Sequence, residues 1–397
     1  MHNESHMTLL NPAILFPFVW LVVIVASPFS SLDFYPYSEL FYWYLWSAMV
    51  LFVLSVISSK GIFRYIFPTK LFKGFRSALS FKLSAYRKIN LYILAMVVSL
   101  LIQAYDMLLL LGSGWWTPAN VVLFRFLVYE EHQSVNFPWV SALNFFFFTA
   151  IPLLLCHPSK RWQRVAIFSL MTGFVYLSSA RASIFTIALI AYFFDWQLHG
   201  FRYRLSLSIA AVLLGSYYVI GAMAGKDTSE IETFAVANYA IGPSHVLDQI
   251  LSNVRHDQLG AVYIFPFLHN TLHAAGLIPE QIPNLAYYFT PHAMNVYTIF
   301  GPYVLDYGIY GSLVCIVGIG LVSGLIFWAS RILKDRYLFF MQSVVLTLLC
   351  LSIFHDLFTS AGYVWASAFL GFFFFPLSER KVRHWPAVST RLRNQIP

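Results

Sequence analysis

Apolar segments of roughly 17–25 residues recur along the whole chain, and this repetition is what most constrains its fold. A helix of this length spans the hydrocarbon core of a bilayer. Only 11% of the 397 residues are charged and the mean hydropathy is +0.68, which excludes a soluble domain of this size. We expect an all-α polytopic integral membrane protein with one membrane domain, 1–397, and about ten spans, near 9–27, 38–58, 89–112, 139–156, 165–179, 182–197, 205–222, 300–329, 337–355 and 360–378.

The distribution of basic residues predicts the orientation of these spans. Loops on the cytoplasmic side of a membrane protein carry an excess of Lys and Arg. With both termini in the cytoplasm, the inner segments hold 21 of the 25 Lys and Arg residues, and only Arg125, Arg181, Lys226 and Arg255 lie outside. This distribution also accounts for the net charge of +8, so we expect contact with anionic membrane lipids and no nucleic-acid partner.

Two regions depart from a simple series of spans. The segment 165–197 lies between basic inner ends and is interrupted by Arg181, so we expect two short spans with this arginine facing protein or water below the outer surface. The alternative is that Arg181 is an interfacial anchor whose side chain extends to the membrane surface. The outer segment 223–299 is far longer than a connecting turn, and it holds enough apolar residues to fold back onto the helices.

Polar residues crowd the point where the chain re-enters the membrane after this long outer segment. The stretch PHAMNVYTIFGPYVLDYGIYG, 291–311, includes His292, Asn295, Tyr297 and Asp306. Burying such groups without partners costs about 2–7 kcal/mol each. We therefore expect a site that lines a water-filled cavity; a helix cap with interfacial tyrosines is the alternative.

Neither a metal nor a cofactor is expected. The three cysteines, Cys156, Cys315 and Cys350, fall within or at the ends of apolar runs and have no metal-ligand spacing. His269 and His273 are four residues apart, but no HExxH glutamate lies between them.

Three features together resemble the O-antigen polymerase (Wzy-type) family. They are SSARAS at the start of a short span, a large outer loop late in the chain, and NVYTIFGPYVLDYGIYG leading into a Gly-rich span. The layout covers most of the chain and is shared with the related O-antigen ligases. Arg181 matches the arginine of the SR-type motif, and Gly308 and Gly311 match the GxxG that follows the large loop.

The resemblance implies an inverting, metal-independent glycosyltransferase of the bacterial inner membrane. It would act at the periplasmic face on undecaprenyl-diphosphate-linked oligosaccharides, with a flippase and a chain-length regulator as possible partners. Arginine presents a planar fork that matches phosphate oxygens, so Arg181, Arg255, Arg125 and Lys226 are candidate ligands of the diphosphate. Candidate catalytic groups are Arg181, His292 and Asp306, and Asn295 and Tyr297 are candidate substrate contacts.

Three alternatives stay open at this point. Ligases of the superfamily carry a His where this chain has Tyr297, eleven residues before Gly308, which disfavours a ligase and leaves the catalytic base unassigned. A metal-dependent lipid-sugar glycosyltransferase would use Asp33 or Glu39 in the first outer segment. A transporter would need charged residues along a path through the spans, and apart from Asp106 these are confined to the 165–197 pair and the start of 300–329.

Overall fold

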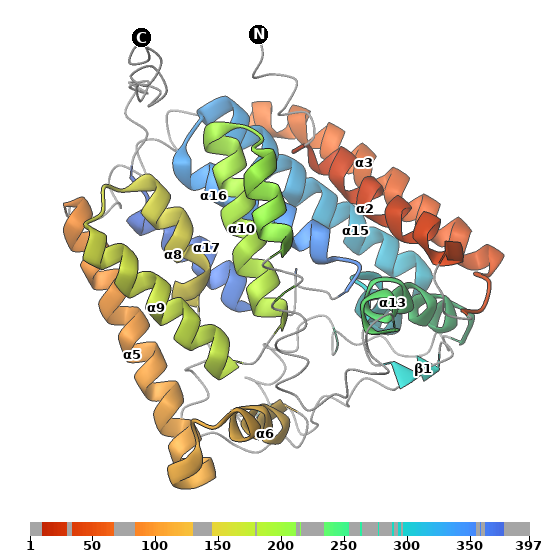
Figure 1. The fold of residues 1–397 in the computed structure, drawn as a ribbon. Coiled ribbons are helices and arrows are strands. Elements are labelled where there is room, and N and C mark those ends of the chain that lie inside the picture. The colour runs from red at the N-terminus through yellow and green to blue at the C-terminus, as the bar shows by residue number, and fades with distance from the viewer. Residues whose placement is uncertain are drawn as a thin grey trace, which may run out of the picture.

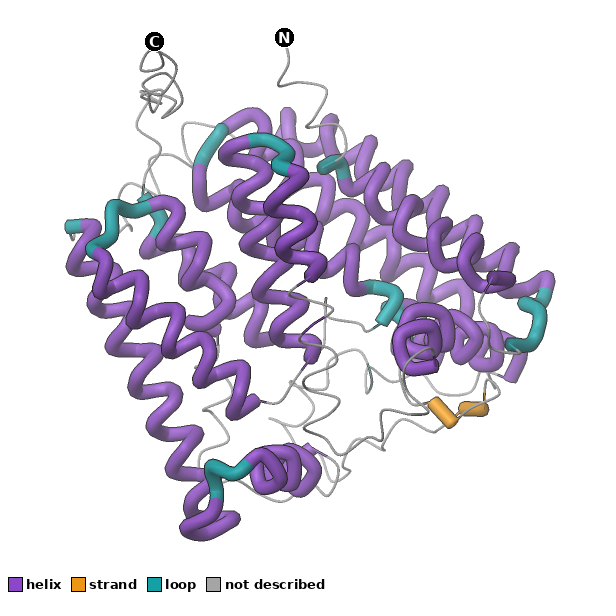
Figure 2. Tube along the Cα trace, viewed as in Figure 1, coloured by secondary structure: helices purple, strands orange, loops and turns teal. Residues whose placement is uncertain are grey.

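A computed structural model gives the fold and describes residues 10–29, 34–66, 84–129, 145–178, 181–211, 215, 234–253, 263, 277, 288–289, 293–294, 297–354, 358 and 362–376. The described part of the chain is almost entirely helical (Figure 2). Residues 203–211 are helical as well. The labelled helices are α2 (Pro12–Ala26), α3 (Glu39–Ile66), α5 (Ala85–Leu111), α6 (Pro118–Tyr129), α8 (Phe145–Cys156), α9 (Arg161–Ser178), α10 (Arg181–His199), α13 (Phe234–Asn253), α15 (Phe300–Leu333), α16 (Arg336–Leu351) and α17 (Gly362–Phe374).

Four short elements complete the described structure. The 3-10 turns η1 (Ser27–Phe29) and η2 (Gly112–Gly114) follow α2 and α5. Two strands, β1 (Tyr288–Phe289) and β2 (Ala293–Met294), pair antiparallel, with Tyr288 opposite Met294.

The helices have the character of a membrane-embedded protein. In the described residues, three helical stretches are long and apolar enough to cross a bilayer: Glu39–Tyr65, Ala85–Gly114 and Phe300–Leu333. Pro12–Ala26, Phe146–Cys156, Arg336–Leu351 and Val364–Phe374 are shorter apolar helices. Large apolar side chains such as Phe18, Leu101 and Val314 point away from the protein and are more than half exposed. The predicted helical membrane fold is therefore confirmed, whereas the count of ten spans stays a prediction.

The 165–197 region forms two helices, α9 and α10, as the position of Arg181 predicted. α10 begins at Arg181 itself. Its other end reaches the start of α16, where the Gln197 side-chain amide donates to the carbonyl of Phe339 (3.0 Å) and to the Ser343 hydroxyl (2.8 Å). Arg181 therefore begins a helix at the end of the bundle opposite the α10–α16 contact (Figure 1).

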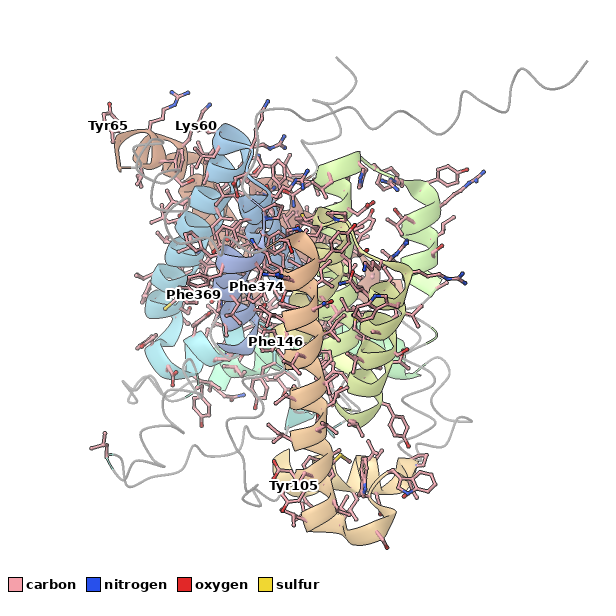
Figure 3. The ribbon with its side chains drawn as sticks, turned by 90° about the vertical axis from the view of Figure 1, so that its left-hand side faces the viewer. Lys60, Tyr65, Tyr105, Phe146, Phe369 and Phe374 are labelled. Carbon is pink, nitrogen blue, oxygen red and sulfur yellow. The ribbon has the colours of Figure 1, made fainter. Side chains whose placement is uncertain are left out.

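Basic residues gather at this α10–α16 end of the bundle. Lys60 lies there near the end of α3, while Tyr105 of α5 lies towards the opposite end (Figure 3). The nearly buried Lys88 at the start of α5 donates to the carbonyl of Phe374 at the end of α17 (3.5 Å), and Arg336 at the start of α16 donates to the carbonyl of Cys156 at the end of α8 (3.0 Å). We call this the basic end of the bundle. Among the described helices, only Arg125 in α6 and Arg181 place a basic residue at the other end.

The close contact between α15 and α3 forms the centre of the bundle. Gly320 and Gly324 of α15, four residues apart, face Ser55 and Ser59 of α3. A Cβ atom on Gly320 would lie 2.9 Å from the carbonyl oxygen of Phe52, so only glycine permits this backbone approach. Small residues at this spacing are the usual means by which helices associate in lipid, where apolar burial gives no net attraction.

We predict that Gly324→Val weakens this contact, because a Cβ there would lie 2.9 Å from both Ser59 Cβ and Val56 Cα. Overpacking of this kind costs about 1–3 kcal/mol. The matched control is Gly318→Val on the same helix, where a Cβ meets nothing within 4 Å. Thermal unfolding of the two purified variants in detergent should show a lower Tm for Gly324→Val alone. Equal Tm values would contradict the tight α3–α15 contact.

Candidate functional site

The candidate site lies where the chain re-enters the bundle before α15, at the end opposite the basic end. α13 contacts α2, α3 and α15 there, and it runs across their ends rather than along them (Figure 1). The sequence predicted that the outer segment would fold back onto the helices, and α13 is the longest described part of it that does so.

The start of α15 is fixed by hydrogen bonds and aromatic packing. The backbone N–H of Ile299 donates to the carbonyl of Ser352 (2.7 Å), just after α16. The indole N–H of Trp20 donates to the Ser352 hydroxyl (3.2 Å). The ring of Phe300 packs against Trp20, with centroids 4.8 Å apart, and against Tyr44 at 5.4 Å. These contacts hold the start of α15 against α2, α3 and the residue that follows α16.

α15 is broken at Gly308, the first glycine of the GxxG motif. Gly308 has φ 68° and ψ −174°, a conformation open essentially only to glycine. At Gly311, a Cβ would lie 2.5 Å from the Cβ of Tyr307. Gly308 is thus required by its backbone conformation, and Gly311 by the close approach of Tyr307. The break at Gly308 separates a short initial segment of α15 from its long apolar part.

Asp306 lies on the short segment just before this break and is 2% exposed. One carboxylate oxygen accepts a hydrogen bond from the backbone N–H of Tyr263 (2.9 Å), 43 residues earlier in the outer segment. The carboxylate therefore ties the outer segment to the broken helix, which is the geometry of a positioning group.

Tyr297 and Thr298 are buried in the same junction, at 3% and 1% exposure. The ring of Tyr297 lies against Gly301, where an added Cβ would come within 2.9 Å of Cδ1. Tyr297 and Asp306 are thus both buried, on either side of the start of α15. That Tyr297 contacts substrate stays a prediction, and its burial gives it a packing role as well.

The other predicted site residues are described only in part. Arg181 begins α10 and Arg125 lies in α6, both at the site's end of the bundle, but neither side chain is among those described (Figure 1). His292, Asn295, Arg255 and Lys226 lie outside the described residues, as does Asp33. Glu39 is exposed in the first turn of α3. In the part of the chain that is described, no three His, Cys, Asp or Glu side chains lie close enough to hold a metal ion.

A polar cluster on α13 was not predicted as part of the site. His245 and Asp248 of this helix hydrogen-bond with Ser27 and Ser38, at the adjoining ends of α2 and α3. The sequence shows both residues in the outer segment, among five histidines and several carboxylates. The signal that could have selected them is the helical spacing of apolar residues around them, Val246, Leu247, Ile250 and Leu251, all of which are buried.

Comparisons of the chain with protein-family models, with curated proteins and with solved structures find no match. The resemblance to O-antigen polymerases therefore rests on the motifs and layout of the sequence.

Proposed function

We propose that this protein polymerises lipid-linked oligosaccharide repeat units, transferring a glycan from undecaprenyl diphosphate to a second repeat unit. The observation that carries the proposal is the glycine-broken start of α15, with the buried Asp306 on it and α13 across its end. Irregular backbone and polar groups at the edge of a membrane domain are stable only where protein or a water-filled cavity surrounds them. A site for a polar sugar attached to a lipid requires this kind of environment.

The basic end of the bundle supports the proposed orientation. By the positive-inside rule, this end faces the cytoplasm, and the junction then faces the periplasm of a bacterial inner membrane. Ten spans with both termini in the cytoplasm satisfy the same rule. An outward-facing site suits a donor that a flippase has already delivered to that face.

The chemistry is an inverting displacement at the anomeric carbon of the donor sugar. A hydroxyl of the acceptor repeat unit forms the new glycosidic bond as the bond to undecaprenyl diphosphate breaks, and a base takes the hydroxyl proton. Arg181 would stabilise the charge that develops on the diphosphate, with Arg255, Arg125 and Lys226 as the other outer cations. His292 and Asp306 are the candidate bases. We give Asp306 a positioning role, because its carboxylate accepts from the backbone N–H of Tyr263 in the outer segment, and His292 a substrate contact.

We predict that Asp306→Asn keeps most of the polymerase activity and that Asp306→Ala loses it. Asparagine still offers an oxygen to the N–H of Tyr263, whereas alanine removes this acceptor, at a cost of about 1–3 kcal/mol. The measurement is the rate of chain extension across a pH series. Asp195→Asn, at the basic end, is the matched control, and its rate of chain extension should equal that of the wild type. Loss of activity in Asp306→Asn at every pH would instead make Asp306 the base.

The proposed role of Arg181 can be tested in cells lacking the chromosomal gene. Arg181→Ala should reduce the surface polysaccharide ladder to single repeat units at a normal membrane level, and Arg181→Lys should restore it only partly, because Lys lacks the planar fork. Arg204→Ala, an exposed arginine at the basic end, should give a full ladder. A full ladder from Arg181→Ala would leave this residue as an interfacial anchor.

A further inference from the structure

A cluster of aromatic and hydroxyl side chains holds α13 against the ends of α2 and α3. We call it the His245 clamp: Ser27, Phe34, Tyr37, Ser244 and His245. The imidazole ring of His245 lies between the rings of Phe34 and Tyr37, with centroids 4.5 and 4.1 Å away and interplanar angles of 6° and 9°. The histidine is 4% exposed, so both of its faces are covered.

Hydrogen bonds complete the clamp at its edges. His245 Nε2 lies 3.2 Å from the hydroxyl of Ser27, and the Tyr37 hydroxyl lies 2.6 Å from that of Ser244. One turn further along α13, Asp248 accepts from both the backbone N–H and the hydroxyl of Ser38. The Ser38 hydroxyl in turn accepts from the N–H of Phe41 and so caps α3 (3.2 Å). Apart from this cap, the contacts join α13 to segments more than 200 positions away in the sequence.

The electrostatic surroundings favour a neutral imidazole. Burial lowers the pKa of His245 to about 4. Among the described residues, the titratable groups that face the clamp are Tyr37 and Asp248, with Tyr42 packed edge-on against Tyr37 and Glu39 exposed beside Ser38. The pKa of Tyr37 is raised, mainly by burial, so this phenol is neutral too. Asp248 is turned towards the Ser38 donors.

We propose that the His245 clamp fixes α13 over the broken start of α15 and loosens when His245 is protonated. Protonation would place a positive charge on a ring that is almost cut off from water, and burial disfavours the charged form. α13 contacts α15 directly, so its docking also determines how the junction is covered. This assigns His245 as a positioning residue and makes the outer side of the protein responsive to acid. The inference stands apart from the polymerase proposal.

The direction of the pH response follows from the lowered pKa. An undocked His245 has the ordinary value of about 6.5, whereas the docked one titrates near 4. The docked state is therefore fully stabilised above pH about 6.5, and the stabilisation is lost as the pH falls from about 6.5 towards 4. Between pH 7.5 and pH 5, the difference between these two pKa values lowers the equilibrium constant for docking of α13 roughly 30-fold.

Hydrogen exchange measured by mass spectrometry on the full-length protein in lipid nanodiscs tests the clamp. After correction for intrinsic exchange rates, the protection of the buried part of α13, 241–251, should fall roughly 30-fold between pH 7.5 and pH 5. The buried helix α16 serves as the internal control, because its protection should stay constant and so shows that the bundle remains folded.

Two variants separate His245 from the other histidines of the outer segment. His245→Phe keeps a flat ring between Phe34 and Tyr37 but cannot be protonated, so the protection of α13 should no longer depend on pH. His245→Ala removes the ring and should expose α13 at both pH values, with α16 unchanged. A flat profile in the wild type, or an equal fall in His245→Phe, would overturn the inference. Neither outcome bears on polymerase activity.

Discussion

The arrangement of the described helices centres on the close approach of α15 to α3. Helices in a bilayer gain nothing from apolar burial against each other, so tight packing and interhelical hydrogen bonds must hold them together. Gly320 and Gly324 let the two backbones meet in the middle of the contact. On one side of the glycines, the Tyr44 hydroxyl lies 2.8 Å from that of Ser312; on the other, the indole N–H of Trp328 donates to the carbonyl of Val56 (3.2 Å). The pair is thus fixed along most of its length.

The broken start of α15 depends on its contacts with the neighbouring helices. A helix that ends within a membrane domain leaves backbone groups unpaired, which lipid does not tolerate. Here the carbonyl of Ser352 accepts the backbone N–H of Ile299, and Gly308 makes the turn at a conformation other residues avoid. The resulting junction holds a buried carboxylate, Asp306, at the end of the bundle away from the basic residues. Under the proposed function, this is where a lipid-linked glycan would meet polar groups.

The sequence predicted the features that depend on local pattern. Apolar length and charge distribution indicated a helical membrane protein, and the position of Arg181 indicated the division between α9 and α10. The GxxG motif includes Gly308, whose backbone conformation requires glycine. These signals are readable because each lies within one short segment.

The contacts between distant segments could not be predicted in the same way. Nothing in the spacing of residues links Asp306 with the N–H of Tyr263, 43 positions away. His245 reaches Ser27 across 218 positions. The apolar spacing around His245 indicates a helix, but it does not name this partner. The burial of Tyr297 is equally a property of the packed junction, since its ring position is set by the approach of Gly301.

Reconstitution tests the central claim, that this bundle builds polysaccharide at the junction before α15, most directly. The purified protein would be placed in liposomes with an undecaprenyl-diphosphate-linked repeat unit and no other protein, and the lengths of the lipid-linked products would be measured. We expect chains of several repeat units that remain attached to undecaprenyl diphosphate. Failure to extend the repeat unit, together with its transfer to a lipid A-core acceptor when one is supplied, would contradict polymerisation and identify a ligase.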